Sequence, residues 1–365
     1  MRLHEFISKL ETRIHPRSAE DFDNVGLLCG NPTREITGIL ICHDALESVV
    51  EEAIEENKNL IVCFHPIVFS GLKKITGKNY VERALLKAIE NKIAIYAIHT
   101  SFDNDYFGVN YGICQALGLH EQKILMPKEG QLSQLQLYVP RDCTEDVKEA
   151  LFRAGAGNIG FYDECSYVLK GEGTFRPKEG SNPFSGHLNE RSVAKEDLIQ
   201  VIFESYKTPQ IINAFTRAHP YEEVAYQIYR LENKNSYSGL GRYGELPAAL
   251  SHEAFLELVK SVFNLEVIRH SGDTGELIRR VGVLGGSGSS GIQAAKSANC
   301  DAYLTGDLKY HDFFQAENQI LLCDIGHFES EQFVTQQLFD ILSEKFPKFA
   351  ISKTKEKTNP VNYFL

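Results

Sequence analysis

Ile39-Leu-Ile-Cys-His-Asp44 is the first of three short apolar runs that set the architecture of the N-terminal third of this chain. The second is Leu60-Ile-Val-Cys-Phe-His65 and the third is Ile93-Ala-Ile-Tyr-Ala-Ile98. None of them alternates polar with apolar residues, which is typical of strands buried on both faces of a parallel sheet. The segments between them carry apolar residues at helical spacing. This order predicts a βαβαβ unit with crossover helices.

The same order of elements recurs near the C-terminus. Strands are predicted over residues 281–284, 302–305 and 320–323, with helices over 292–298 and 313–317. The step from Asp44 to His65 is 21 positions, and the step from Gly286 to Asp307 is also 21. We therefore expect a duplicated βαβαβ core with mostly parallel sheets, the alternative being that the two spacings agree by chance.

A different pattern separates the two halves. Residues 130–234 predict a strand, a helix, a glycine-rich ribbon with a further strand, a helix and a last strand, with a polar return linker over 232–239. This order predicts an inserted α+β ferredoxin-like domain with its own core. The expected organisation is a discontinuous core, 1–129 with 235–365, interrupted by a domain at 130–234.

Composition limits the classes of function. The chain has 365 residues and a formal net charge of −11, so it carries no global positive field for a nucleic-acid backbone. Its eight cysteines include no CxxC pair, which argues against a zinc ribbon or a disulfide framework. No apolar run reaches the length of a signal peptide or a membrane span, and we expect a soluble, cytoplasmic protein.

Polar residues gather at or just beyond the carboxyl ends of the predicted strands, the edge at which open α/β sheets bind ligands. His327 and Glu331 are four apart where a helix would place both on one face, and Asp103 lies four beyond His99. His65 precedes a proline that forces an extended exit from its strand. Two imidazoles with two carboxylates suit Zn, Fe or Mn. The alternative is that each is an ordinary loop residue or a surface hydrogen-bond pair.

The loop Gly285-Gly-Ser-Gly-Ser-Ser-Gly291 lies between a predicted strand and a predicted helix. Backbone N–H groups in such a loop can bind an anion, but the loop lacks the lysine of a Walker motif and the GxGxxG spacing. We interpret it as a tight strand-to-helix turn near the site.

Seven ordered motifs resemble the Nif3-like family, whose members are known as GTP cyclohydrolase I type 2 homologues. They span nearly the whole chain: Ala19-Glu-Asp-Phe-Asp-Asn-Val-Gly-Leu27, Phe64-His-Pro-Ile-Val-Phe-Ser-Gly-Leu-Lys-Lys74, His99-Thr-Ser-Phe-Asp103, Gly239-Leu-Gly-Arg-Tyr-Gly-Glu-Leu246, Gly285-Gly-Ser-Gly-Ser-Ser290, Thr305-Gly-Asp-Leu-Lys-Tyr-His-Asp312 and Asp324-Ile-Gly-His-Phe-Glu-Ser-Glu331. The inserted domain is similar to the PII/CutA-like module of the longer members.

The resemblance implies a toroidal homohexamer with up to two divalent cations in each subunit. Carried over by motif, the metal ligands are His65, Asp103, His327 and Glu331. The family has a histidine where this chain has Phe64. Either the metal position next to Phe64 binds its cation weakly, or His43 or His99 takes the place of the family histidine as a ligand. The alternative for these two residues is that they only orient other ligands by hydrogen bonds.

The function implied by the resemblance is a metal-dependent hydrolase of GTP or a related purine nucleotide, with His99 as the candidate for proton transfer. The rival hypothesis is a non-catalytic metal-binding hexamer that acts as a scaffold or regulator. We expect neither membrane nor nucleic acid as a partner.

Overall fold

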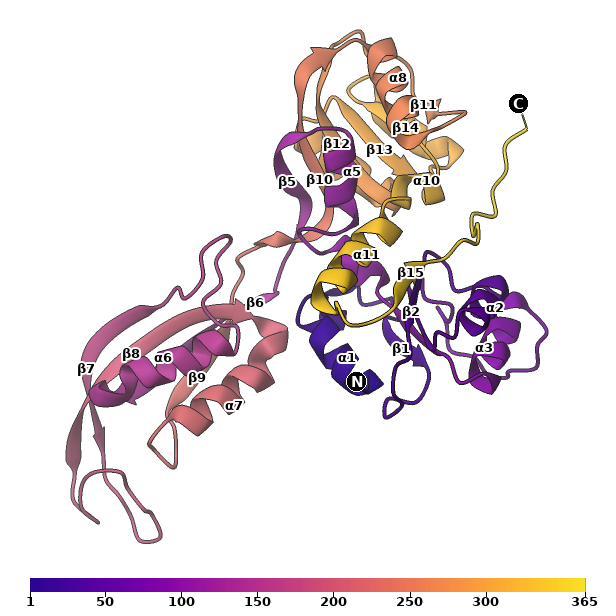
Figure 1. Ribbon diagram of the computed structural model, residues 1–365. Helices are drawn as coiled ribbons and strands as arrows, with labels where there is room; N and C mark the ends of the chain where they lie inside the picture. The colour runs from indigo at the N-terminus through magenta and orange to yellow at the C-terminus, as the bar shows by residue number, and fades with distance from the viewer. Residues whose placement is uncertain (365) are drawn as a thin grey trace. The chain divides into compact units, whose positions relative to one another are not determined.

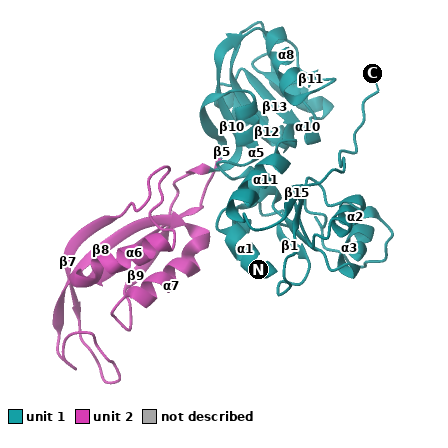
Figure 2. Ribbon diagram, viewed as in Figure 1, with its two compact units in different colours: residues 1–126, 238–365 teal, residues 127–237 magenta. Residues whose placement is uncertain are grey.

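The computed structural model describes residues 1–364, and these divide into two compact units. One unit is discontinuous and comprises residues 1–126 with 238–365, while the other comprises residues 127–237 (Figures 1 and 2). No helix in the described part of the chain is long and apolar enough to cross a membrane.

The first sheet of the discontinuous unit has the strand order β1-β4-β3-β2-β15. Strand β1 is antiparallel to β4, and the other pairs are parallel. Helix α1 precedes this sheet, helices α2 and α3 connect its strands, and helices α4 and α5 follow β4. The bounds are Leu3–Glu11 for α1, Gly26–Cys29 for β1, Ile39–Cys42 for β2, Glu47–Glu55 for α2, Leu60–Cys63 for β3, Tyr80–Glu90 for α3, Ala94–Ala97 for β4, His99–Asp103 for α4, Val109–Ala116 for α5 and Ile351–Lys353 for β15.

The second sheet of this unit has the order β11-β14-β13-β12-β10-β5. Strands β12, β13 and β14 are parallel, as β2, β3 and β4 are in the first sheet. The bounds are His120–Lys128 for β5, Asn235–Leu250 for β10, His252–Phe263 for α8, Arg269–His270 for β11, Ile278–Ser287 for β12, Ile292–Ser297 for α9, Ala302–Gly306 for β13, Leu321–Asp324 for β14, His327–Glu331 for α10 and Val334–Lys345 for α11. Two parallel three-stranded units thus confirm the α/β fold class predicted from the sequence.

Alternate residues of the central strands pack on opposite faces of the first sheet. Ile39 and Ile41 lie in a hydrophobic cluster that also takes in Val281 and Leu304 of the second sheet, whereas Leu40 packs against α2 and α3 on the other face. Helix α11 packs on β2 and β15, helix α5 packs on β12, and the two helices contact each other. One apolar core therefore joins both sheets of this unit.

Two local predictions for the discontinuous unit were wrong. The helix expected over 313–317 is a 3₁₀ helix, Tyr310–Ala316, which ends because Glu317 adopts a left-handed backbone. The polar run 232–239, expected as a linker, is partly β10, because the chain becomes extended from Asn235 and Ser238 already bridges to Asp105.

The second unit contains a four-stranded antiparallel sheet of order β7-β8-β6-β9. Helices α6 and α7 cover the apolar face of this sheet, where Leu135, Leu137, Ile199 and Phe215 are fully buried. The bounds are Leu132–Pro140 for β6, Thr144–Arg153 for α6, Tyr167–Phe175 for β7, Ser192–Glu204 for β8, Thr208–Ala218 for α7 and Tyr226–Arg230 for β9. This βαββαβ order confirms the ferredoxin-like prediction.

Candidate metal centre

The first sheet delivers three histidines to one edge. His43 directly follows β2, His65 lies two residues after β3, and His99 begins α4 just after β4. Because β2, β3 and β4 are parallel and in register, with Cys42 opposite Cys63 and Cys63 opposite Ala97, their carboxyl ends meet at the same edge. Buried strands therefore position all three imidazoles.

The second sheet delivers a histidine and a carboxylate. His327 and Glu331 are the first and last residues of α10, which follows β14, and the four-residue spacing places both on one face of the helix. Asp307 follows the neighbouring parallel strand β13. The two sheets therefore contribute to one site.

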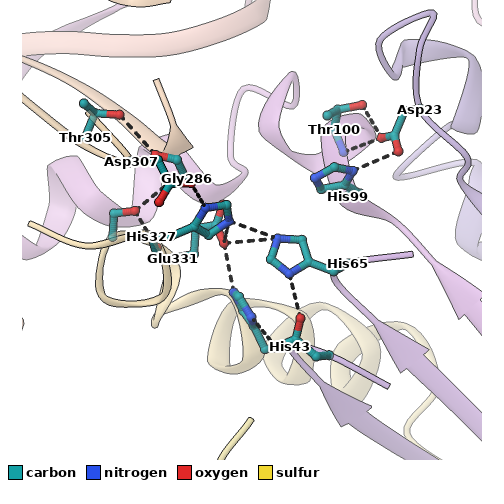
Figure 3. Close-up of polar contacts among 12 residues, drawn as sticks. Asp23, His43, His65, His99, Thr100, Gly286, Thr305, Asp307, His327 and Glu331 are labelled. Atoms are coloured by element: carbon teal, nitrogen blue, oxygen red, sulfur yellow. Dashed lines mark hydrogen bonds and ion pairs between the residues drawn. The ribbon is translucent and has the colours of Figure 1, made fainter. Parts of the chain in front are cut away.

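Three imidazole nitrogens converge on one carboxylate oxygen. Glu331 Oε2 lies 3.0 Å from His43 Nε2 and 3.4 Å from both His65 Nε2 and His327 Nε2 (Figure 3). The Nε2 atoms of His65 and His327 are themselves 3.4 Å apart. Glu331 is nearly fully buried, so these contacts form away from bulk water.

Carboxylates hold the opposite side of each ring. Asp44 contacts Nδ1 of His65 at 2.9 Å and Nδ1 of His43 at 3.1 Å, and Asp307 contacts Nδ1 of His327 at 2.7 Å. When Nδ1–H donates to a carboxylate, the neutral ring presents a lone pair at Nε2. Such carboxylate–histidine pairs orient metal-binding imidazoles in proteins.

The donor atoms fit a cation. Two imidazole nitrogens on one tetrahedral zinc ion, each at about 2.0–2.1 Å, lie about 3.4 Å apart, which is the separation between His65 and His327. Donor atoms of His65, His327 and Glu331 all lie within 4.8 Å of one another, as do those of His43, Asp44 and His65. Glu331 Oε2 and His43 Nε2 are buried and 3.0 Å apart as an ion pair, but neither atom makes a hydrogen bond of good geometry with the described residues. A divalent cation would satisfy both atoms.

Without a cation, protons balance the negative charge of the site. Burial lowers the pKa of His65, but contacts with Asp44 and Glu331 outweigh burial and raise this pKa to about 10. Burial also lowers the pKa of His327, but contacts with Glu331 and Asp307 outweigh burial and raise this pKa to about 9. Burial disfavours the charge of Glu331, yet the surrounding imidazoles hold its pKa well below the usual range.

Asp103 lies at the end of α4 and is buried. Burial, followed by the negative charge of Glu331, raises its pKa well above the usual range. Its Oδ1 has no hydrogen-bond partner among the described residues, yet Asp103 does not belong to either close group of donor atoms. The structure thus brings His65, His327 and Glu331 together and leaves Asp103 as a nearby buried carboxylate.

His99 lies beside this group. Its ring centroid is 5.2 Å from that of His65, and its Nδ1 contacts Asp23 Oδ1 at 2.8 Å. Burial raises the pKa of Asp23, but hydrogen bonds from His99 and Thr100 outweigh burial and lower it. His99 therefore has the same carboxylate support as the other three histidines (Figure 3).

Phe64 fills the space between the imidazoles. Its side chain is fully buried, and its ring centroid lies 5.4 Å from that of His43, 5.0 Å from that of His65 and 5.6 Å from that of His99. Of the two candidate substitutes for the family histidine at position 64, His43 points its Nε2 at Glu331, whereas His99 contacts Asp23.

Glycines of the loop 285–291 and of β13 lie against helix α10, which carries His327 and Glu331. A Cβ atom on Gly286 would lie 2.3 Å from Glu331 Oε1, and one on Gly306 would lie 2.7 Å from the backbone nitrogen of His327. The Gly286 N–H donates to Ser330 Oγ at 2.8 Å. These glycines let α10 approach the sheet, consistent with the interpretation of the loop as a tight turn near the site.

The predictions from the sequence do not include Asp44, Asp307 and Asp23 as partners of Nδ1. A usable signal existed for two of them, because Asp44 and Asp307 follow parallel strands at the edge where the histidines lie. Asp23 lies in a turn 76 residues before His99, and no local pattern connects the two.

Comparison with known proteins decides the family. The model of Duf34/NIF3 (NGG1p interacting factor 3) matches residues 1–360. The chain belongs to the Duf34/NIF3 family. Within that family it is 35% identical over 363 residues to the "GTP cyclohydrolase 1 type 2 homolog" of Bacillus subtilis (strain 168), covering 98% of this chain and 97% of that protein.

Other similar proteins agree with this assignment. The homologue of the same name in Halalkalibacterium halodurans is 36% identical, with 98% of each chain covered. The crystal structure of a Bacillus cereus protein related to NIF3 matches with a TM-score of 0.88 and 34% identity, covering 100% of this chain and 99% of that chain. Staphylococcus aureus protein SA1388 matches with a TM-score of 0.78 and 26% identity over the same shares.

Proposed function

We propose that this Duf34/NIF3 protein is a metal-dependent hydrolase that acts on GTP or a related purine nucleotide. The observation that carries the proposal is the convergence of three carboxylate-supported imidazoles on the buried Glu331 oxygen. The substrate class comes from the name of the relatives, "GTP cyclohydrolase 1 type 2 homolog".

His65, His327 and Glu331 would hold one divalent cation, Zn, Fe or Mn. His43 would be a further ligand, in place of the family histidine that is Phe64 in this chain. Asp103 would help to bind a second cation. Burial and the negative charge of Glu331 disfavour its ionised form, and a nearby cation would stabilise that form. A bound cation supplies a water molecule whose pKa is lowered towards neutrality. Asp44 and Asp307 would hold a proton on Nδ1 of the ligand histidines, so that Nε2 is the atom that faces the cation.

His99 is the proposed proton-transfer residue. Its Nδ1–H donates to Asp23, so Nε2 remains available to accept a proton from water and return it to the leaving nitrogen. Hydrolysis at purine C8 consumes one water to open the imidazole ring to a formamide. A second water releases formate from that formamide and leaves a free amine.

A formate-release assay with GTP tests the proposal. The wild type, Glu331→Gln and Glu331→Ala are each loaded with Zn, Fe or Mn, and Glu344→Ala on the exposed face of α11 is the matched control. We expect metal-dependent turnover in the wild type and the control, and a loss of at least 100-fold in both Glu331 variants. Absence of turnover with every metal would contradict the hydrolase proposal.

Phe64 favours a second candidate function, a non-catalytic metal-binding scaffold. A buried phenyl ring occupies the position of a family metal ligand, and a scaffold would tolerate the loss of a ligand better than an enzyme. In this proposal the chain forms the toroidal homohexamer of the family and the cation stabilises the protein. Light scattering with and without chelator, together with the formate assay, separates a metal-dependent assembly without turnover from an enzyme.

A further inference from the structure

A cavity of about 410 Å³ opens beside the candidate metal centre. His43, His65 and His327 line one part of it, and the C-terminal segment lines another through Pro360, Val361 and Tyr363. Pockets that bind small molecules span about 300–1,000 Å³ and combine apolar walls with a few convergent polar groups. This cavity is large enough for a mononucleotide.

Arg269 of strand β11 is the one lysine or arginine among the described residues that line the cavity. Its Nη1 donates to Asp324 Oδ2 at 2.9 Å and its Nη2 donates to the carbonyl of Leu308 at 2.9 Å. Its guanidinium carbon also lies 5.3 Å from the centroid of the Phe313 ring. The Asp324 side chain is buried and also accepts the N–H of Leu308, so the anchor is fixed. Arg269 is therefore held in place before any ligand arrives.

This anchored guanidinium keeps free donors. Arginine has five N–H donors, and two of those on Arg269 are used, which leaves three without a partner among the described residues. The side chain is 56% exposed, so these donors are accessible.

The carboxylates that line the cavity are, by contrast, already engaged within the protein. Each has a basic or amide partner: Asp44 has His43 and His65, Asp307 has His327, Asp324 has Arg269, and Glu329 has the side-chain amide of Asn359. The guanidinium is thus the permanently cationic side chain among the described lining residues, and it keeps three unused N–H donors.

We propose that Arg269 binds the phosphate of a mononucleotide-sized ligand whose reacting ring lies at the metal-site histidines. The proposal rests on the proposed hydrolase function and names the residue that selects a phosphate-bearing substrate. A planar guanidinium with free N–H groups binds a phosphate through two parallel hydrogen bonds. Val267, Phe328 and Tyr363 form apolar walls suited to the ring.

Calorimetric titration of the zinc-loaded protein tests this subsite, with GMP as the probe and guanosine as its uncharged counterpart. We expect the wild type to bind GMP at least tenfold more tightly than guanosine. Arg269→Gln should reduce that preference to less than threefold and leave guanosine binding unchanged. Arg279→Gln is the matched control, because Arg279 is exposed, pairs with Glu245 and does not line the cavity.

Zinc content and the thermal midpoint of each variant show whether it is folded. Arg269→Lys keeps the charge and the aliphatic stem and should lose part of the GMP preference, so it carries the test if Arg269→Gln does not fold. An unchanged preference in the Arg269 variants, or equal binding of GMP and guanosine by the wild type, overturns the subsite. The formate assay on Glu331 variants is independent of these titrations, so failure of the subsite and failure of the hydrolase proposal are distinguishable.

Discussion

Asp44 is the residue that contacts two candidate ligands at once. Its two oxygens contact Nδ1 of His43 and Nδ1 of His65, whereas Asp307 supports only His327. Loss of such a carboxylate lowers metal affinity about 10–100-fold. We expect Asp44→Asn to weaken zinc binding more than Asp307→Asn does, as measured by competition with a chromophoric chelator. The control variant Asp21→Asn, at an exposed position, should bind zinc as tightly as the wild type does. If Asp44→Asn also bound zinc as tightly as the wild type, the role assigned to Asp44 would be contradicted.

The raised pKa values of His65 and His327, about 10 and about 9, predict a pH-dependent metal affinity. An imidazolium ring, protonated on both nitrogens, cannot bind a cation. At pH values well below 9, His65 and His327 are both imidazolium in the metal-free protein. Each displaced proton makes the apparent affinity rise up to about tenfold per pH unit, so zinc binding should strengthen as pH rises from 6.5 to 9. Titrations in two buffers of different ionisation enthalpy count the released protons. A flat affinity over this range would refute the prediction.

The sequence indicated candidate site residues but not the carboxylates that contact them. His65, His327 and Glu331 were identified because they follow buried strands at one sheet edge. Asp23 was missed because its contact with His99 is made by tertiary structure rather than by local spacing. The direction in which His43 points was left open for the same reason, since the position of α10 decides it.

At the scale of elements, the end of β12 sets how closely helix α10 approaches, because Gly286 lies there. Gly286 has a φ of +69°, and a Cβ there would lie 2.3 Å from Glu331 Oε1. Gly118 provides a matched control, because its φ is +67° and no atom lies within 4 Å of the position of its Cβ. We expect both Gly→Ala variants to lose about 1 kcal/mol or more of stability from the backbone strain.

Only Gly286→Ala should also lose zinc, because only there does the added methyl group displace Glu331. Thermal unfolding and metal analysis of the two variants measure the two effects separately. Full zinc content in Gly286→Ala would show that α10 can shift without loss of the site.

The elements that the sequence predicted best are the buried parallel strands. An uninterrupted apolar run as short as residues 60–63, with two β-branched residues, favours a buried strand over a helix. The helix predicted over 313–317 is instead a 3₁₀ helix over 310–316, because a short apolar pattern does not distinguish α from 3₁₀ geometry.

At the scale of the whole molecule, the candidate ligands join two sheets. His43 and His65 belong to the first sheet, and His327 and Glu331 to the second. A cation that binds only the folded state adds about 2.7 kcal/mol of stability at 100 times its dissociation constant. Removal of metal by EDTA should therefore lower the thermal midpoint of the discontinuous unit.

Hydrogen exchange locates this effect. Zinc should slow exchange at the ends of β2 and β3 and in α10, and should leave β6 and β8 of the second unit unchanged as internal controls. The second unit has its own apolar core and contains none of the candidate ligands. Equal slowing in both units would contradict a local metal effect.

The division of the ligands along the chain also has a consequence for biosynthesis. His65 and His327 are 262 residues apart in sequence, and ribosomes add about 5–20 residues per second, so roughly 13 to 50 s separate the synthesis of the two. During that interval the nascent chain presents His43, Asp44 and His65 without Glu331. Loading of a cation on the complete candidate ligand set would therefore be a late event, open only once Glu331 has been synthesised.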